Sequence, residues 1–218
     1  MELIKLSHLF KSYGSINILQ DLSVSYGAGN VYGLVGENGA GKTTMFRCIM
    51  GLTDYEGKIT KSDSIRVGFM PAESFFYPLI TAKEYIEFCL RAKGVEIDDK
   101  EIERVNNLFE LPMNRFASSF STGMKKKLAF MALLLQKNDL MILDEPFNGI
   151  DLRGCINMKK IIREQSLQGR TFIISSHQIA ALREICKEID FLCNHNILKR
   201  YTDESVQDIE QDILQRMQ

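Results

Sequence analysis

Residues 36–43 read Gly-Glu-Asn-Gly-Ala-Gly-Lys-Thr, which matches the phosphate-binding pattern G-x-x-x-x-G-K-[ST] at every position. Backbone N–H groups in this pattern form a nest around a phosphate chain, and its glycines allow dihedrals that a Cβ would block. The Lys42 ammonium can reach the β- and γ-phosphates, and the Thr43 hydroxyl can ligate Mg²⁺. The stretch predicts an ATP site. Its candidate binding residues are Gly36, Glu37, Asn38, Gly39, Ala40, Gly41, Lys42, Thr43 and Thr44.

The flanking residues predict a strand before this loop and a helix after it. Val31–Val35 is a short apolar run, and the helical segment 43–50 is followed by Gly51. A helix N-terminus has free N–H groups and the positive end of the helix dipole, which favour a bound phosphate. An ordinary glycine-rich turn is the alternative, and the strand–loop–helix context argues against it.

The composition indicates a globular protein with no global attraction to nucleic acid. The 218-residue chain has a formal net charge of −1 and a hydrophobic content of 45%. Its longest apolar run, 128–135, is far shorter than the ~20 residues that a membrane span requires. The N-terminus lacks a basic region followed by an apolar core, so no secretory signal is expected. The five cysteines include no C-x-x-C pair and are expected to be reduced in a cytoplasmic protein.

Hydrophobic periodicity predicts the remaining elements. Residues 4–10 and 22–26 alternate between apolar and polar, which is typical of an antiparallel β region. Further strands are expected at 57–60, 65–70, 139–144, 171–175 and 190–193, and helices from Thr81 and at 98–108, 121–136, 151–168, 178–189 and 203–218. Buried strands alternating with helices predict an α/β fold with a mostly parallel core sheet, here as a single domain over 1–218. The acidic last helix is interpreted as solvated.

A second segment with catalytic potential is Leu-Met-Ile-Leu-Asp-Glu-Pro at 140–146. It predicts an apolar strand with two carboxylates at its carboxyl end, the end at which parallel α/β sheets bind ligands. Asp144 is placed to hold Mg²⁺, directly or through water, and Glu145 is a candidate general base for an attacking water. Many strands end in an acidic turn, so the pattern gains its weight from the phosphate loop that precedes it.

Four segments together resemble the ATPase subunit of an ABC transporter. They are Phe120-Ser121-Thr122-Gly123-Met124-Lys125-Lys126-Lys127-Leu128, Asp144-Glu145-Pro146, Asn148-Gly149-Ile150-Asp151 and Ser175-Ser176-His177. Residues 120–124 stand where the family has its Leu-Ser-Gly-Gly-Gln signature, and the Ser-x-Gly-Met-Lys form looks most like the ABC-2 type, a largely exporter group. The resemblance implies a P-loop NTPase fold with an N-terminal antiparallel β subdomain and an inserted helical subdomain at about 74–120, and it implies ATP and Mg²⁺ as cofactors.

The resemblance also implies roles for residues outside the phosphate loop. In this family, ATP lies between the phosphate loop of one subunit and the signature of the facing subunit, so Ser121 and the Gly123 N–H would contact ATP held by a partner chain. Asp151 matches the D-loop aspartate that communicates across the dimer. Tyr13 fits the aromatic that stacks on adenine, although it could be a plain hairpin aromatic. The implied catalytic residues are Lys42, Glu145 and the switch histidine His177, for which a capping or core position is the alternative.

Two positions depart from the family pattern. Ala72 stands where the family places a glutamine, and alanine can neither ligate Mg²⁺ nor hydrogen-bond the lytic water. Glu73 is the candidate replacement after a shift of one residue, which makes Thr43, Asp144 and Glu73 the implied metal ligands. Thr122 replaces a signature glycine and is interpreted as subtype variation.

Two surface patterns have alternative interpretations. Lys125–Lys127 could contact nucleic acid, but three consecutive helical residues spread around the circumference, so a solvated face is expected. The consecutive aromatics Phe75, Phe76 and Tyr77 either form a buried corner or line a groove for a short helix of a membrane partner, where aromatic anchors are favoured.

The function that the resemblance implies is ATP hydrolysis by a subunit that dimerises around ATP, most simply as a homodimer. The dimer would drive a separately encoded transmembrane permease, an exporter, at the inner face of the cell membrane. The alternatives are a weakly hydrolysing regulatory module and a non-transport ABC ATPase acting on DNA or ribosomes. A P-loop kinase is disfavoured because phosphotransfer to a small acceptor requires neither the signature nor His177.

Overall fold

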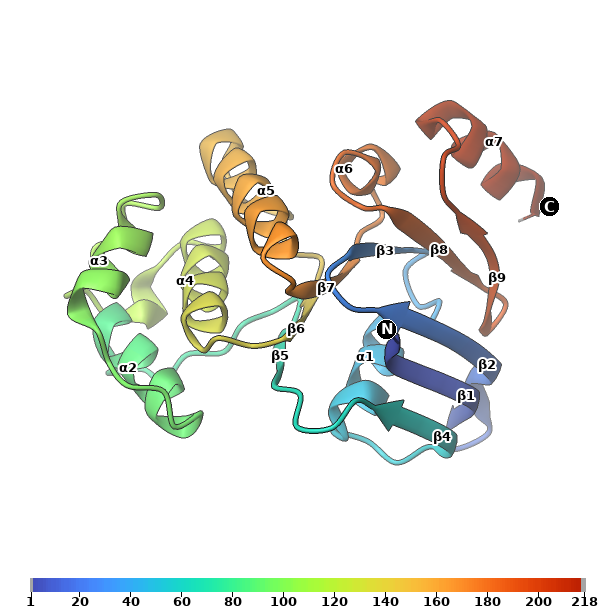
Figure 1. Cartoon of the computed structure of the whole chain (residues 1–218), viewed down its shortest axis with the longest axis horizontal. Helices are drawn as coiled ribbons and strands as arrows, with labels where there is room; N and C mark the ends of the chain where they lie inside the picture. Colours follow the sequence, from blue (N-terminus) through green and yellow to red (C-terminus); the bar gives the residue numbers. More distant parts are fainter. Residues whose placement is uncertain (1, 217–218) are drawn as a thin grey trace.

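The computed structural model describes residues 2–216, and two sheets organise them (Figure 1). The three-stranded antiparallel sheet has the order β2-β1-β4, with β1 at Glu2–Tyr13, β2 at Ile16–Gly27 and β4 at Glu56–Lys61. Ile4 and Leu6 of β1 are buried on one face, and Leu9 is buried after an irregularity in the register between Leu6 and Leu9. The antiparallel N-terminal region expected from the sequence is therefore confirmed.

The six-stranded sheet has the order β5-β6-β7-β3-β8-β9. Its strands are β3 (Val31–Val35), β5 (Val67–Met70), β6 (Leu140–Asp144), β7 (Thr171–Ser175), β8 (Glu188–Cys193) and β9 (Asn196–Tyr201). All neighbouring pairs are parallel except β8 and β9. Every residue of β3, β6 and β7 is buried, as is typical of parallel strands that are covered on both faces. The predicted fold class is confirmed.

The helices are α1 (Lys42–Met50), α2 (Ala82–Ala92), α3 (Asp99–Asn106), η1 (Ala117–Ser119), α4 (Thr122–Leu135), α5 (Leu152–Leu167), α6 (Ile179–Arg183) and α7 (Val206–Arg216). In Figure 1, α2 and α3 form one end of the molecule, far from the three-stranded sheet, and α4 lies beside them. Side chains of Thr81, Asp98, Ser121 and Asp151 accept the N-capping hydrogen bonds of α2, α3, α4 and α5. Within residues 2–216, no helix has both the length and the apolar character needed to cross a bilayer.

The C-terminal part differs from the sequence-based expectations. The helix expected at 178–189 is only the short α6, because residues 188–193 join the sheet as β8. The following strand, β9, was not predicted. Asn194 and His195 take positive φ values of 48° and 69°, which form the tight turn that returns the chain as β9. The expectation of a solvated terminal helix is also wrong for one face of α7, since Ile209 and Ile213 are buried.

A partly buried ion pair joins β8 to β9, in which Arg200 also pairs with Glu188 at 2.9 Å. The carboxylate of Asp190, only 1% exposed, accepts hydrogen bonds from Arg200 at 2.6 and 2.9 Å. The guanidinium lies 5.5 Å from the ring centroid of Tyr26 and 5.8 Å from that of Tyr32. Removing one member of such a pair leaves an uncompensated buried charge.

Replacing Arg200 with methionine is therefore expected to lower the free energy of unfolding by about 3 kcal/mol. Urea denaturation followed by circular dichroism measures this change. Arg216→Met, which removes an exposed pair with Asp212, is the matched control and should leave the midpoint nearly unchanged. Equal midpoints for the two variants would contradict the assignment of a stabilising role to the Arg200–Asp190 pair.

Candidate nucleotide site

A cavity of about 390 Å³ lies at the carboxyl ends of β3 and β6. Its lining residues are Ile18, Asn38, Gly39, Gly41, Lys42, Thr43, Thr44, Ala72, Asp144 and Glu145. The structure thus brings the predicted phosphate loop together with both carboxylates that follow β6. Gly36, Glu37 and Ala40 belong to the same loop but are not among the residues that line the cavity.

The loop conformation explains its glycines. Gly39 and Gly41 have φ values of 85° and 110°, which side chains other than glycine rarely adopt. Gly36 is required for another reason, because a Cβ there would collide with the carbonyl oxygen of Leu192 in β8. No side chain caps α1, so its first backbone N–H groups face the loop side and can bind an anion.

The Lys42 side chain is buried and folds back onto the phosphate loop. Its Nζ donates to the carbonyl oxygens of Gly36 at 2.6 Å and Glu37 at 2.9 Å. Burial lowers the pKa of Lys42, and the nearby carboxylates of Glu145 and Asp144 oppose that shift. An ammonium that has already lost most of its water binds a phosphate anion without a further large desolvation cost.

Asp144 and Thr43 form the part of the site that fits a magnesium ion. Thr43 Oγ1 donates to Asp144 Oδ2 at 2.6 Å, and Ser175 Oγ donates to the other carboxylate oxygen. Hydroxyl and carboxylate oxygens are the ligands that Mg²⁺ prefers, usually in company with substrate phosphates. Ser175 belongs to the segment 175–177 that carries the family resemblance, but no role was predicted for it; its register opposite Asp144 across β6 and β7 places it there.

Glu145 and His177 lie together at the edge of the cavity. The His177 Nδ1 and Glu145 Oε2 atoms are 3.1 Å apart, and Asn148 Nδ2 donates to the same oxygen at 3.1 Å. The Glu145 side chain is largely buried, whereas His177 is half exposed. A core position for His177 is therefore wrong. Asn148 belongs to the quoted segment 148–151, but its contact with Glu145 was not predicted from the sequence.

The structure does not bring Glu73 into the cavity. Ala72 lines the wall near Thr43 and Asp144, while the Glu73 side chain is exposed. The small side chain of Ala72 thus occupies the position where the family pattern has a glutamine. The assignment of Glu73 to the metal stays a prediction.

Three other predicted site residues, Ser121, Gly123 and Asp151, do not line this cavity. Ser121 Oγ accepts a hydrogen bond from the Met124 N–H at the start of α4. Asp151 caps α5 by accepting from the Gly154 N–H at 2.6 Å.

Tyr13 also stands outside the residues that line the cavity. It is the last residue of β1 and is half exposed, and Lys11 Nζ lies 4.6 Å from its ring centroid. One face of the ring is therefore covered by a cation, and its proposed stacking on adenine remains a prediction.

Two of the three consecutive lysines contradict the expected solvated face. Lys126 and Lys127 are 4% and 8% exposed, and their ammonium groups reach the loop between β6 and α5. Lys127 Nζ donates to Asp151 Oδ2 at 2.6 Å, and the bond lowers the pKa of Asp151. Only Lys125 has the partial exposure expected from the sequence.

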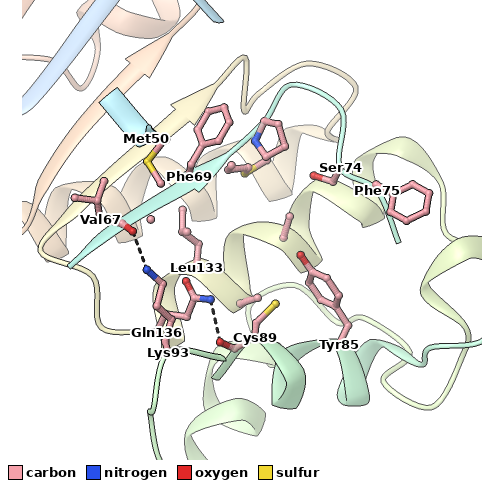
Figure 2. Close-up of a pocket in the computed structure, with 15 residues that line it drawn as sticks. Met50, Val67, Phe69, Ser74, Phe75, Tyr85, Cys89, Lys93, Leu133 and Gln136 are labelled. Atoms are coloured by element: carbon pink, nitrogen blue, oxygen red, sulfur yellow. Dashed lines mark hydrogen bonds between the residues drawn. The ribbon is translucent and has the colours of Figure 1, made fainter. Parts of the chain in front are cut away.

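A second cavity, of about 420 Å³, lies between β5 and the helices α2 and α4 (Figure 2). Two hydrogen bonds close one side of it, from Lys93 Nζ to the Val67 carbonyl at 2.9 Å and from Gln136 Nε2 to the Cys89 carbonyl at 3.1 Å. Phe75 lines the other side and is 77% exposed.

The three consecutive aromatics therefore divide between the two interpretations. Phe76 is buried and packs against Tyr85 with ring centroids 4.6 Å apart. Phe75 and Tyr77 are exposed and contact each other edge to face. The middle ring belongs to the core, and the outer two are free to meet a partner.

Comparisons with known proteins identify similar sequences and similar folds. The family model described as "ABC transporter" matches residues 19–148. The lantibiotic transport ATP-binding protein SrtF of Streptococcus pyogenes is 29% identical over 209 residues, which cover 90% of this chain and 89% of SrtF. A solved ATP-binding subunit of an ABC transporter superposes with a TM-score of 0.84 at 26% identity, over 97% of this chain and 93% of that one. The dimeric bacterial ABC transporter cassette MJ0796 has the same fold, with a TM-score of 0.84 at 21% identity, over 93% of this chain and all of that one.

Proposed function

Since the chain belongs to the ABC transporter family and is an ATP-hydrolysing nucleotide-binding domain, we propose that two copies close around ATP and drive a separately encoded membrane permease. The observation that carries the proposal is one cavity lined by Lys42, Thr43, Asp144 and Glu145, with His177 against Glu145. We assign export as the direction, supported by the Ser-x-Gly-Met-Lys form at 121–125. The subunit would then sit at the inner face of the membrane through its permease.

The residues of the cavity suit in-line attack of water on the γ-phosphorus. Lys42 and the loop N–H groups would offset the charge on the transferring phosphoryl group. Glu145 would orient the attacking water and accept its proton, held in place by His177 and Asn148. Thr43 and Asp144 would hold Mg²⁺, which when bound neutralises charge on the β- and γ-phosphate oxygens.

In the proposed dimer, predicted residues outside the cavity, such as Ser121, would act on the ATP of the facing copy. Ser121 at the start of α4 is exposed and can reach ATP held by a facing copy, where the α4 dipole favours an anion. The MJ0796 cassette, which has the same fold as this chain, forms a dimer, and this supports the proposal of a dimer here. For the permease, we propose that a short helix docks in the cavity beside Phe75, where exposed aromatics are suitable anchors.

Complementation between two inactive variants tests the composite site. In a heterodimer of Lys42→Ala and Ser121→Ala chains, one site lacks both groups and the other retains both. We expect each variant alone to release little phosphate and the mixture to recover activity. The matched control mixes Ser121→Ala with the double variant, which leaves no intact site. A mixture as inactive as this control would show that Ser121 does not act on the partner's ATP.

Ala72 favours a second candidate function, a regulatory module that binds ATP and hydrolyses it weakly. A wall residue without a polar side chain cannot orient water. Phosphate release at saturating ATP and Mg²⁺, with and without the permease, distinguishes the two candidates. Turnover that the permease raises supports the transporter subunit, and slow turnover that it leaves unchanged supports the regulatory module.

Magnesium dependence tests the predicted metal ligands. Because Glu73 lies outside the cavity, we expect Glu73→Ala to keep the Mg²⁺ concentration for half-maximal hydrolysis within about twofold, and Asp144→Ala to raise it about tenfold or more. The measurement is phosphate release over a range of free Mg²⁺ at saturating ATP. Equal shifts in the two variants would make Glu73 a ligand and require residues 71–80 to rearrange.

A further inference from the structure

Lys126 is a buried cation that the proposed mechanism does not use. Its side chain leaves α4 toward the loop after β6, and Nζ donates a hydrogen bond to the main-chain carbonyl of Glu145. Burial lowers the pKa of Lys126, and the carboxylates of Glu145 and Asp144 oppose the shift. Burying an ammonium costs free energy, so an apolar side chain would stabilise the fold more at this position if packing were its only role.

The carbonyl that Lys126 holds belongs to a strained residue. Glu145 has a φ of 47°, in the left-handed region that costs a non-glycine residue roughly 1 kcal/mol or more. Its N–H donates to Ser175 Oγ at 2.9 Å, and its carbonyl oxygen accepts a long hydrogen bond from the Asn148 N–H at 3.5 Å besides the one from Lys126. Without Lys126 the carbonyl keeps the long hydrogen bond from Asn148, so the strained peptide is held less firmly and the carboxylate can turn away from His177.

Further contacts hold the start of α4 on the same loop. A Cβ at Gly123 would lie 2.5 Å from the carbonyl oxygen of Gly149, so the backbones approach closely there. The bond from Lys127 to Asp151 adds a third attachment. The Lys126 ammonium is therefore presented to Glu145 from a helix whose position is already determined.

We propose that Lys126 is a positioning residue that holds the main chain of Glu145, and thus its carboxylate, in the orientation required for hydrolysis within the same chain. The proposal rests on the role of Glu145 as the base. Lys126 does not line the nucleotide cavity and would act through the Glu145 peptide. Loss of Lys126 is therefore expected to lower the turnover number and to leave the affinity for ATP unchanged.

The first experiment separates turnover from affinity. Lys126→Met keeps the length of the side chain and removes the hydrogen bond. We expect kcat to fall about 10- to 100-fold, as for a small misplacement of a catalytic group, with the KM for ATP within about twofold of the wild-type value. Lys160→Met, at an exposed lysine of α5, is the matched control and should keep both constants. An unchanged kcat for Lys126→Met, or a loss matched by the control, would overturn the proposal.

The second experiment asks in which chain Lys126 acts. A heterodimer in which one chain carries Glu145→Gln retains one working base, in the other chain. We expect Lys126→Met to slow phosphate release in a single turnover only when it is in the chain with the intact Glu145. If Lys126→Met lowers the rate equally in either chain, Lys126 supports α4 in general and the proposal is overturned. If it lowers the rate only in the chain that carries Glu145→Gln, Lys126 supports Ser121 instead, and the proposal is likewise overturned.

The controls distinguish failure of this inference from failure of the proposed function. If Glu145→Gln keeps full hydrolysis, Glu145 is not the base and the proposed mechanism fails first. If Glu145→Gln is inactive but Lys126→Met is not, only the positioning role fails. Thermal melting of Lys126→Met shows whether its loss of turnover occurs in a folded chain.

Discussion

Glu145→Gln is expected to lower phosphate release by about 10²- to 10⁴-fold while ATP binding persists, because an amide keeps the shape of the carboxylate but cannot accept a proton from water. With hydrolysis blocked, ATP should remain between the two subunits and an ATP-bound dimer should accumulate. Light scattering with and without ATP measures the dimer, and a phosphate assay measures turnover.

Glu103→Gln, at an exposed glutamate of α3, is the matched control and should behave as the wild-type chain does. A Glu145→Gln chain that stays monomeric at saturating ATP would contradict the composite site. A variant that dimerises but still hydrolyses ATP at the wild-type rate would instead remove Glu145 from the role of base.

Lys42→Ala should weaken ATP binding by about 10²-fold or more, since truncating one member of a buried charge pair typically costs several kcal/mol. Calorimetry with a non-hydrolysable ATP analogue measures the affinity. Lys58→Ala, at an exposed lysine of β4, is the control. Affinity equal to that of the control would remove the phosphate-binding role of Lys42.

Folding and binding can be separated in the Lys42 variant. Because burial lowers the pKa of Lys42 in the folded chain, its protonated form costs stability at neutral pH. Removing the ammonium relieves that cost, so we expect the melting temperature of Lys42→Ala without nucleotide to be no lower than that of the wild-type chain. Weak ATP binding together with a lower melting temperature would indicate a folding defect instead.

The parts of the site that were predicted from the sequence are those that local chemistry dictates. A phosphate loop requires its glycines and lysine in one contiguous stretch, and an apolar strand that ends in Asp144 and Glu145 is visible by itself. The starts of α2 and α4 near Thr81 and Ser121 were predicted for the same reason, because a capping side chain and its helix are adjacent in sequence.

The parts that were missed depend on contacts between distant residues. Lys126 and Lys127 read as a solvated basic face because their partners, Glu145 and Asp151, lie on another element. Periodicity describes one helix at a time and contains no information about what packs against it. The short α6 and the strand β9 were missed similarly, because pairing with the sheet outweighed local propensity.

The contact between Gly36 and Leu192 bears on how such sequences should be compared. The β8 backbone at Leu192 leaves no room for a side chain at position 36, with or without a bound nucleotide. The Lys42 ammonium, by contrast, donates its hydrogen bonds within the described residues to two carbonyls of the phosphate loop. A descendant of this chain that had lost its enzymatic activity could discard the lysine at little cost to folding but would have to keep the glycine. Among related sequences, a lysine at position 42 is therefore the better indicator of an active ATPase, and a glycine at position 36 indicates only that the fold is retained.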